Sequence, residues 1–260
     1  MRAMQTAATG MEAQTLRIDT IANNLANADT TGFKKSQVDF AELMYITMRW
    51  PGGGSTQDTQ APTGLQVGSG VFPVSTLKIF TEGTITSTAG DLDMAISGPG
   101  FFQVDTPSGA VKFTRDGNFR VGPDGVVVNS QGFPLYPQLS IPQDTTAISI
   151  GSDGTVTVQP ADGTPTAIGQ IQLANFRNPA GLSSEGANLM AETVASGSPL
   201  TGTPGVGGYG ELKQGYLETS NVEVVNELVD LIVAQRTYEL NSKVVKAGDH
   251  ILQTTNQIAG

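Results

Sequence analysis

The chain contains no cysteine and a single histidine, His250, in 260 residues. Without cysteine it can form no disulfide, no thiolate nucleophile and no cysteine-ligated metal site. One histidine among scattered carboxylates indicates neither a Ser-His-Asp triad nor a histidine-rich metal site. The stretch GVGGYG at 205–210 fits G-x-G-x-x-G, but SPLTGTP precedes it rather than a predicted strand. We therefore expect no enzyme, no catalytic residue, no metal and no cofactor.

An excess of basic residues and long apolar runs are also missing. The 14 lysines and arginines are outnumbered by 24 acidic residues, so the formal net charge is −10 and we expect no nucleic-acid partner. No apolar run approaches the ~20 residues of a membrane span, so we expect no direct membrane insertion. The opening MRAMQTAATGMEAQT lacks the apolar core of a signal peptide. We expect that any export proceeds without cleavage of such a peptide.

Glycine and proline are scarce at both ends of the chain. Residues 1–31 contain only Gly10, and residues 216–260 contain only Gly248 and Gly260, with no proline in either range. All 14 prolines and the other 29 glycines lie between these ranges. Because these residues interrupt helices, the ends are free to be helical and the middle is not.

The N-terminal range has a heptad rhythm. One row of apolar residues, spaced by seven, is Met4, Met11, Ile18 and Leu25. A companion row is Met1, Ala8, Thr15 and Ala22. The pattern predicts a long helix with an a/d seam of one large and one small row, the small row allowing close approach of a partner.

The C-terminal range predicts a second long helix, with Ser220 or Asn221 as its N-cap and Glu223 completing a capping box. Its interface face is expected to be Val225, Val229, Ile232, Leu240, Val244 and Ile251. A second apolar face runs beside it, and a helix that is apolar on two sides is usually buried on two sides. Two interpretations remain open. This is either the core helix of one globule, or a helix that packs on the N-terminal helix and also on neighbouring subunits.

The pattern in the middle of the chain predicts short strands. Apolar residues alternate with polar ones between Gly, Pro, Asp and Asn turns, beginning with Phe102 and Val104. The segment ISIGSDGTVTV predicts one hairpin that turns at Asp153 and Gly154. We expect residues 81–205 to form a central antiparallel β-domain.

Residues 43–72 are interpreted as a long β-hairpin arm. Its expected contacts are made by Tyr45, Trp50, Leu65 and Val67. Between its two sides lies the glycine-rich segment 50–63, which we expect to be a flexible tip. A disordered loop between helix and β-domain is the alternative.

The stretch ANNLANADTTGFKKS at 22–36 carries three asparagines where the first helix should end. Asn23, Asn24 and Asn27 can bond backbone groups at a helix end, and Leu25 closes the apolar seam. Thr31 offers a turn, Gly32 permits positive φ, and Phe33 is expected to anchor the chain where it leaves the helix. We interpret this motif as the junction between the helical layer and the arm. An ordinary helix exit would explain Gly32 equally well.

Three motifs together resemble one family. They are ANNLANADTTGFKKS, the β-region GPGFFQVDTPSGAVKFTRDGNFRVGPDGVVVNSQG, and GYLETSNVEVVNELVDLIVAQRTYELNSKVV. In this order they resemble the flagellar axial proteins, the rod and hook subunits, over nearly the whole chain. Length and the arm make the chain most similar to the distal-rod members.

The resemblance implies an α+β fold in three parts. A terminal helical domain, 1–31 with 220–260, forms a coiled-coil-like inner layer of a tube. A connecting domain, 32–80 with 206–219, includes the arm, and 81–205 is the outer domain.

It further implies a homo-oligomeric helical tube that is straight, rigid and hollow. Such a tube transmits motor torque to the hook, serves as an export channel, and spans the periplasm within the basal body after type III export. The implied partners are proximal rod proteins, hook or hook-adaptor subunits and surrounding periplasmic and outer-membrane rings. A hook-type or proximal-rod subunit, or a non-flagellar secreted tube or adhesin protein, is the alternative.

Overall fold

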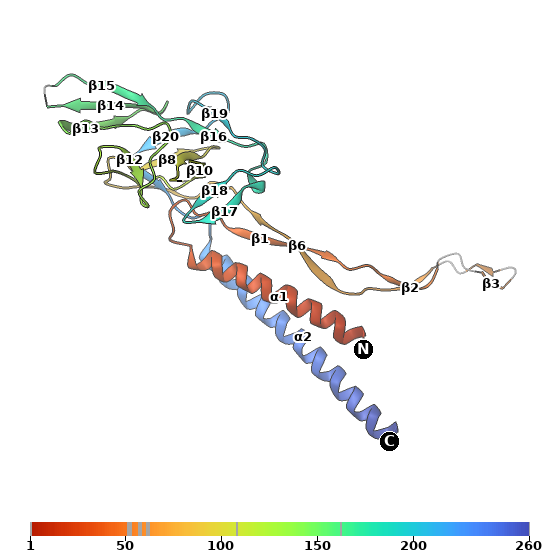
Figure 1. Cartoon of the computed structure of the whole chain (residues 1–260). Helices are drawn as coiled ribbons and strands as arrows, with labels where there is room; N and C mark the ends of the chain where they lie inside the picture. The colour runs from red at the N-terminus through yellow and green to blue at the C-terminus, as the bar shows by residue number, and fades with distance from the viewer. Residues whose placement is uncertain are drawn as a thin grey trace. The chain divides into compact units, whose positions relative to one another are not determined.

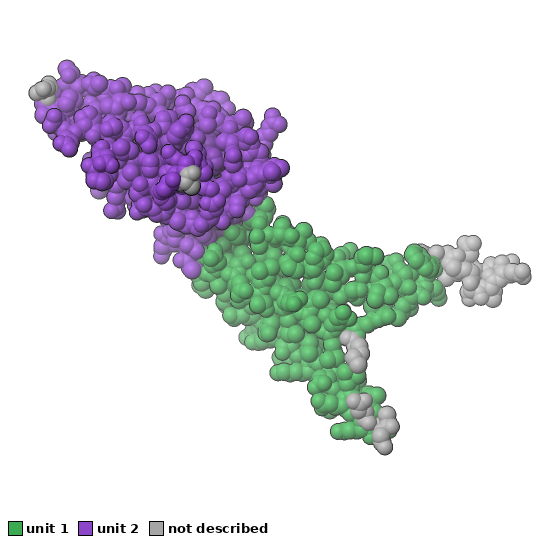
Figure 2. Space-filling view, in the orientation of Figure 1, with its two compact units in different colours: residues 1–25, 36–77, 223–260 green, residues 26–35, 78–222 purple. Residues whose placement is uncertain are grey.

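The computed structural model describes residues 2–50, 54–56, 59–60, 63–107, 109–161 and 163–259. The chain divides into two compact units, drawn in different colours in Figure 2. Unit 1 comprises residues 1–25, 36–77 and 223–260, and unit 2 comprises residues 26–35 and 78–222. The segment after the first helix therefore belongs with the β-rich part of the chain. The three-part division expected from the sequence stays a prediction.

Two long helices form one side of unit 1. Helix α1 spans Arg2–Ala26 and helix α2 spans Val224–Ala259, and the two lie side by side (Figure 1). Within the described residues, neither helix combines the length and apolar character of a membrane span. Helix α2 begins four residues later than Ser220, so the predicted capping box is wrong. The carbonyl of Glu223 accepts the first helical bond, from the amide of Glu227 at 3.0 Å.

Paired strands form the rest of unit 1. Strand β1 (Ser36–Glu42) is hydrogen-bonded to β6 (Val71–Lys78), and β2 (Ile46–Arg49) is antiparallel to β5 (Leu65–Val67). Strands β3 (Gly54–Thr56) and β4 (Thr59–Gln60) pair beyond them. The predicted flexible tip falls in part on residues 51–53, 57–58 and 61–62, which lie outside the described residues.

Unit 2 is built from short antiparallel strands, as the alternating pattern predicts. Its largest sheet has the order β17-β18-β10-β9, and a second has the order β13-β14-β15. Two further pairs, β20 with β8 and β21 with β7, join the end of the unit to its beginning. The bounds are β7 Ile85–Ser87, β8 Met94–Ser97, β9 Phe102–Asp105, β10 Val111–Thr114, β11 Phe119–Val121, β12 Val127–Asn129, β13 Thr145–Ile150, β14 Thr155–Pro160, β15 Thr166–Gln170, β16 Leu173–Asn175, the 3-10 turn η1 Pro179–Gly181, β17 Ser183–Gly186, β18 Leu189–Ala191, β19 Leu200–Gly202, β20 Glu211–Gln214 and β21 Tyr216–Glu218.

The hydrophobic core of unit 2 lies between these sheets. Phe102 and Leu135 are fully buried in it, and the Phe102 ring packs edge-on against Phe119 with centroids 5.2 Å apart. A second cluster surrounds Phe101 and Phe113. The hairpin predicted at Asp153 and Gly154 is confirmed, since β13 and β14 pair across it. Two helices with a mostly β middle agree with the predicted α+β class.

Candidate assembly surfaces and their junction

Helices α1 and α2 meet through small residues. A Cβ placed on Gly10 would lie 2.8 Å from the Asn241 side chain, and one on Gly248 would lie 2.6 Å from Met4. Ala234 of α2 is fully buried. Arg17 and Asp230 add an exposed ion pair at 3.0 Å. The helices thus approach closely where glycine and alanine leave room, as small residues allow at helix contacts.

The seam residues predicted on α1 are only partly covered. Met4, Met11, Ile18 and Leu25 are all half-buried in the single chain. The companion residues Ala8 and Ala22 are exposed. The residues that α1 buries are instead Ala7, Ala13, Ile21 and Asn24. One chain therefore leaves part of the predicted seam open.

The predicted interface face of α2 is exposed along its whole length. Exposure reaches 73% at the first residue and 67% at the last, in the set Val225, Val229, Ile232, Leu240, Val244 and Ile251. Each of these residues is thus at least 45% exposed in the single chain. We call this set the α2 apolar face.

Asn24 is the polar centre of unit 1 and is 2% exposed. Its side-chain oxygen accepts from the Ser36 amide at 2.9 Å, and its Nδ2 donates to the Ser36 carbonyl at 2.9 Å. The same Nδ2 donates to the buried Glu227 carboxylate at 3.3 Å. One asparagine thus connects the end of α1, the start of β1 and the first turn of α2, since its amide offers both donors and an acceptor.

The other residues of the motif lie in different settings. Asn23 is exposed. Asn27 accepts the Thr30 hydroxyl at 3.2 Å, and Thr31 donates to Asp116 at 3.0 Å. The motif therefore divides its asparagines between the two units.

Gly32 makes the closest backbone approach in the motif. Its φ is +67°, and an added Cβ would lie 2.6 Å from the backbone of Arg115 and Asp116. Its amide donates to the Glu218 carbonyl at 2.8 Å. Phe33 follows, half-buried, with the Lys78 ammonium 5.1 Å from its ring centroid. Glycine is required at 32 both by conformation and by space.

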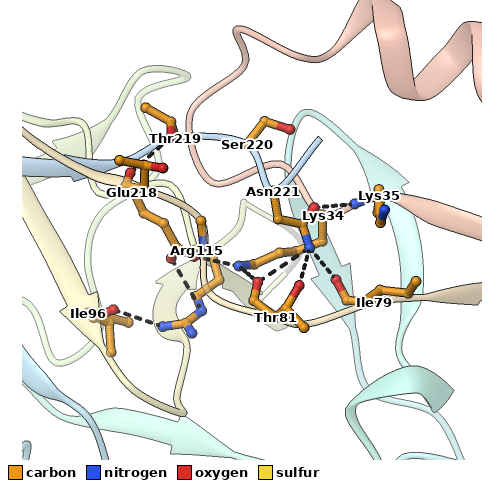
Figure 3. A network of polar contacts seen from close by, with 12 residues as sticks. Lys34, Lys35, Ile79, Thr81, Ile96, Arg115, Glu218, Thr219, Ser220 and Asn221 are labelled. Atoms are coloured by element: carbon orange, nitrogen blue, oxygen red, sulfur yellow. Dashed lines mark hydrogen bonds and ion pairs between the residues drawn. The ribbon is translucent and has the colours of Figure 1, made fainter. Parts of the chain in front are cut away.

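A buried ion cluster lies beside this turn (Figure 3). The Lys34 ammonium is 2.5 Å from Oε1 of Glu218, and both side chains are 1% exposed. The Arg115 guanidinium lies 3.6 Å from the other Glu218 oxygen and donates to the Gly98 carbonyl at 2.7 Å. Lys34 also donates to the Thr81 carbonyl at 2.6 Å. We call Lys34, Arg115 and Glu218 the ion cluster.

Burial opposes charge at both cations of the ion cluster. Desolvation lowers the pKa of Lys34, and the adjacent Glu218 carboxylate counteracts part of that effect. Desolvation likewise lowers the pKa of Arg115, again against Glu218. Since one carboxylate makes the ion pairs with two buried cations, its loss would leave both without their ion-pair partner, and only the weaker attraction of Glu82 would remain.

Asn221 ties the same region together through its amide. Its oxygen accepts from the Lys35 amide at 2.8 Å, and its nitrogen donates to the Ile79 carbonyl at 2.8 Å and to the Thr81 hydroxyl at 3.0 Å. The residue predicted as a helix cap is thus a bridge between three segments of unit 2 (Figure 3).

The four predicted contact residues on the paired strands are mostly exposed. Trp50 is 72% exposed, Leu65 is 52% and Tyr45 is 49%, while Val67 is half-buried. The Tyr45 hydroxyl donates to Glu42 at 2.8 Å, and this bond raises the tyrosine pKa. These strands present apolar side chains to the surroundings of the chain.

Sequence reasoning did not single out the ion cluster or Glu227. Lys34, Arg115 and Glu218 each lie inside one of the three motifs, but Lys34 and Glu218 are 184 positions apart. Each of the three has a polar or charged residue directly after it in the chain, so no local pattern marks them as buried. Among the residues that the structure describes, no group of histidine, cysteine or carboxylate side chains could hold a metal ion. The ion cluster is enclosed and bonded to backbone, so it serves structure.

Comparison with known families gives three matches along the chain. Residues 4–34 match "Flagella basal body rod protein", residues 95–158 match "Flagellar hook protein FlgE/F/G D1 domain", and residues 213–258 match "Flagellar basal body rod FlgEFG protein C-terminal". These matches fall on the three motifs that resemble axial proteins. The class is therefore that of the axial proteins of the flagellar rod and hook.

Individual relatives narrow the class. The flagellar basal-body rod protein FlgG of Buchnera aphidicola subsp. Schizaphis graminum is 49% identical over 96% of both chains. The proteins of that name from Caulobacter vibrioides and Borreliella burgdorferi are 45% and 43% identical over 99% of this chain, and over 99% and 98% of their own. The chain belongs to the FlgG family of flagellar basal-body rod proteins. These names describe structural parts of the flagellum, and none is that of an enzyme.

Proposed function

We propose that the chain is the structural subunit of the distal rod and polymerises helically into a straight, rigid, hollow shaft. The shaft transmits motor torque to the hook and leaves a channel for export. The observation that carries this proposal is the α2 apolar face, which stays exposed although α1 lies beside α2. Covering each of its large side chains is worth ~1.5–3 kcal/mol, which favours packing against other copies.

The helices form the inner layer in this proposal. The coiled-coil-like contact joins α1 and α2 of one chain through glycine and alanine, and neighbouring chains cover the α2 apolar face. The half-buried Met11, Ile18 and Leu25 complete the same interface. A helix apolar on two sides needs two partners, and one chain supplies one of them.

The paired strands β1–β6 and β2–β5 act as the arm in this proposal. Their exposed apolar residues contact adjacent copies and resist sliding between rows, which keeps the polymer straight. The β-rich part faces outward, toward the surrounding periplasmic and outer-membrane rings. Proximal rod proteins lie at one end, and hook or hook-adaptor subunits lie at the other. The subunit reaches the periplasm by type III export without cleavage of a signal peptide.

The test compares two aspartate substitutions on α2. Ile232→Asp places a charge on the α2 apolar face at a position 55% exposed, so the monomer should stay folded while polymerisation fails. Gln235→Asp places the same charge at an exposed polar position and should leave assembly within about twofold of wild type. Sedimentation and electron microscopy of the purified chain measure the outcome.

Normal tubes from Ile232→Asp would contradict the proposal. Tubes that curve would favour a hook-type subunit over a rod subunit. A wild-type chain that forms no polymer under any condition would remove the proposed function altogether.

A further inference from the structure

Unit 1 contains a cavity of about 400 Å³ at the base of the paired strands. Its walls include Gly10 of α1 and residues at the ends of the paired strands, namely Leu43, Tyr45, Gly68, Gly70 and Val71. Thr6 and Glu42 complete the wall, and three of its eight residues are glycines, which contribute no side chain. The volume is within the range of ~300–1,000 Å³ typical of ligand pockets.

Two of the glycines have no room for a side chain. A Cβ on Gly70 would lie 2.2 Å from the Thr9 hydroxyl, and one on Gly10 would lie 2.8 Å from Asn241. A Cβ on Gly68 would meet only the Tyr45 ring, at the ordinary distance of 3.6 Å. Gly68 is therefore the wall position where a larger side chain can enter the cavity without displacing backbone.

Trp50 is the counterpart of this cavity. It is the one tryptophan of the chain, directly follows β2 and is 72% exposed. A tryptophan buries about 150–250 Å² when it is covered, and tryptophan is enriched among the residues that dominate interface energies.

The chain's own Trp50 does not reach its own cavity. Pairing of Ile46 with Val67 and of Arg49 with Leu65 holds β2 extended. The five residues from Tyr45 to Trp50 therefore span ~16 Å of strand. In Figure 1 the paired strands lead from β1 and β6 to β2, away from α1 within the same unit. A tryptophan that enters this cavity therefore comes from another copy of the chain.

We propose that Trp50 of one copy inserts into the cavity of a second copy, between Tyr45 and the part of the wall that contains Gly10, Gly68 and Gly70. This deepens the proposed function and rests on it. A projection and a socket at different places on one chain make a heterologous contact, and such contacts generate helical polymers. The Tyr45 ring offers an edge-to-face partner for the indole. The Glu42 carboxylate at the cavity wall, which accepts Tyr45 on one oxygen, can accept the indole N–H on the other.

Fluorescence tests the proposal directly, because Trp50 is the sole source of tryptophan emission. In wild-type monomer, acrylamide should quench Trp50 readily. In the polymer, emission should shift to the blue and quenching should fall severalfold. Gly68→Leu fills the socket, so its polymer should keep monomer-like emission or require a severalfold higher protein concentration to form. Gly68→Ala, which adds one methyl group, is the matched control and should resemble wild type.

A polymer in which Trp50 stays as quenchable as in the monomer overturns the inference and leaves the proposed function intact. A Gly68→Leu polymer that forms at the wild-type protein concentration with the full blue shift also overturns it, since another apolar surface of the second copy then covers Trp50. Complete absence of self-association overturns both. These outcomes separate the socket from the polymer itself.

Cross-linking gives a second measurement that does not depend on the leucine variant. The chain has no cysteine, so Trp50→Cys and Gly68→Cys can be mixed, polymerised and treated with a short bismaleimide. A cross-linked dimer of the two variants is expected. Trp50→Cys mixed with Val194→Cys, whose side chain is fully exposed in unit 2, should give none. Equal cross-linking in both mixtures would contradict the assigned contact.

Discussion

The two units treat their apolar residues in opposite ways. In unit 2, Phe102 and Leu135 are fully buried among other side chains of the same unit. In unit 1, Val225 and Leu240 are 73% and 60% exposed, although they lie on a helix that already has a partner. Unit 2 thus completes its core within one chain, whereas unit 1 leaves much of its apolar surface for others to cover.

Two ion pairs, one from each unit, show a similar contrast. The Lys34–Glu218 pair of unit 2 has both side chains 1% exposed, while the Arg17–Asp230 pair of unit 1 is 38% and 51% exposed. Buried pairs depend on each other strongly, and exposed pairs contribute little. We therefore expect unit 2 to carry most of the stability of the monomer, and in the proposed function unit 1 carries the capacity to assemble. Each of the following predictions tests that division.

The largest effect is expected from the core of unit 2. Phe102→Ala removes a fully buried ring that packs on Phe119 and should lower the free energy of unfolding by about 3–5 kcal/mol. Ile251→Ala on the α2 apolar face, 67% exposed, should change it by less than about 0.5 kcal/mol. Urea unfolding of the monomer followed by circular dichroism measures both. Similar losses for the two variants would erase the contrast between the units.

The ion cluster gives the next test, through two Glu→Ala substitutions within unit 2. Glu218→Ala removes the ion-pair partner of buried Lys34 and Arg115 and should lower the free energy of unfolding by about 3–5 kcal/mol. Glu185→Ala breaks an ion pair with Lys112 in which the glutamate is 46% exposed, and should cost less than about 1 kcal/mol. Urea unfolding followed by circular dichroism measures the free energy of unfolding of both variants. If Glu218→Ala and Glu185→Ala lowered the free energy of unfolding by similar amounts, the ion cluster would not stabilise the turn after α1.

The smallest effect is a pH dependence with a defined sign. Burial raises the pKa of Asp116, so the folded state keeps its proton to higher pH than the unfolded state. The contribution of Asp116 to stability therefore falls as pH rises from 3.8 through the raised pKa. Asp116→Asn removes this fall and keeps an oxygen for the Thr31 hydroxyl. The variant should gain stability relative to wild type over that range, as measured by unfolding at a series of pH values.

Asp153→Asn is the control of opposite sign. Hydrogen bonds from Thr155 lower the pKa of Asp153, so its contribution to stability is present above pH 3.8 and is lost as pH falls through the lowered pKa. The asparagine variant should therefore lose stability relative to wild type as pH rises through that range. If the stability of both variants relative to wild type changed in the same direction with pH, burial would not be the cause of the raised pKa of Asp116.

Much of the secondary structure could be predicted from local patterns. Strands β9 and β10 follow the period-two alternation of Phe102, Val104 and Phe113, and both helices lie where glycine and proline are scarce. The start of α2 could not be predicted, because Ser220 and Asn221 have suitable side chains for a cap. Tertiary contacts use Asn221 instead, to bridge Lys35 and Ile79. Local propensity was overridden by hydrogen bonds to distant backbone.

The asparagine-rich motif shows what a local pattern can predict and what it cannot. The sequence indicates that Asn24 lies where a helix ends and needs polar partners. It does not indicate that one partner is Glu227, 203 positions away. Likewise, Gly32 suggests a turn, but the backbone of Arg115 that excludes any side chain there is visible only in the folded unit.

The sequence by itself determined where helices and strands form, because breakers and apolar periodicity act over a few residues. It also determined the family, through three motifs in order. Only the tertiary structure decided which faces are covered, which charges meet in the ion cluster, and which apolar side chains remain exposed. Those outcomes depend on contacts between residues far apart in the chain, and a local pattern specifies that a face is apolar without specifying what covers it.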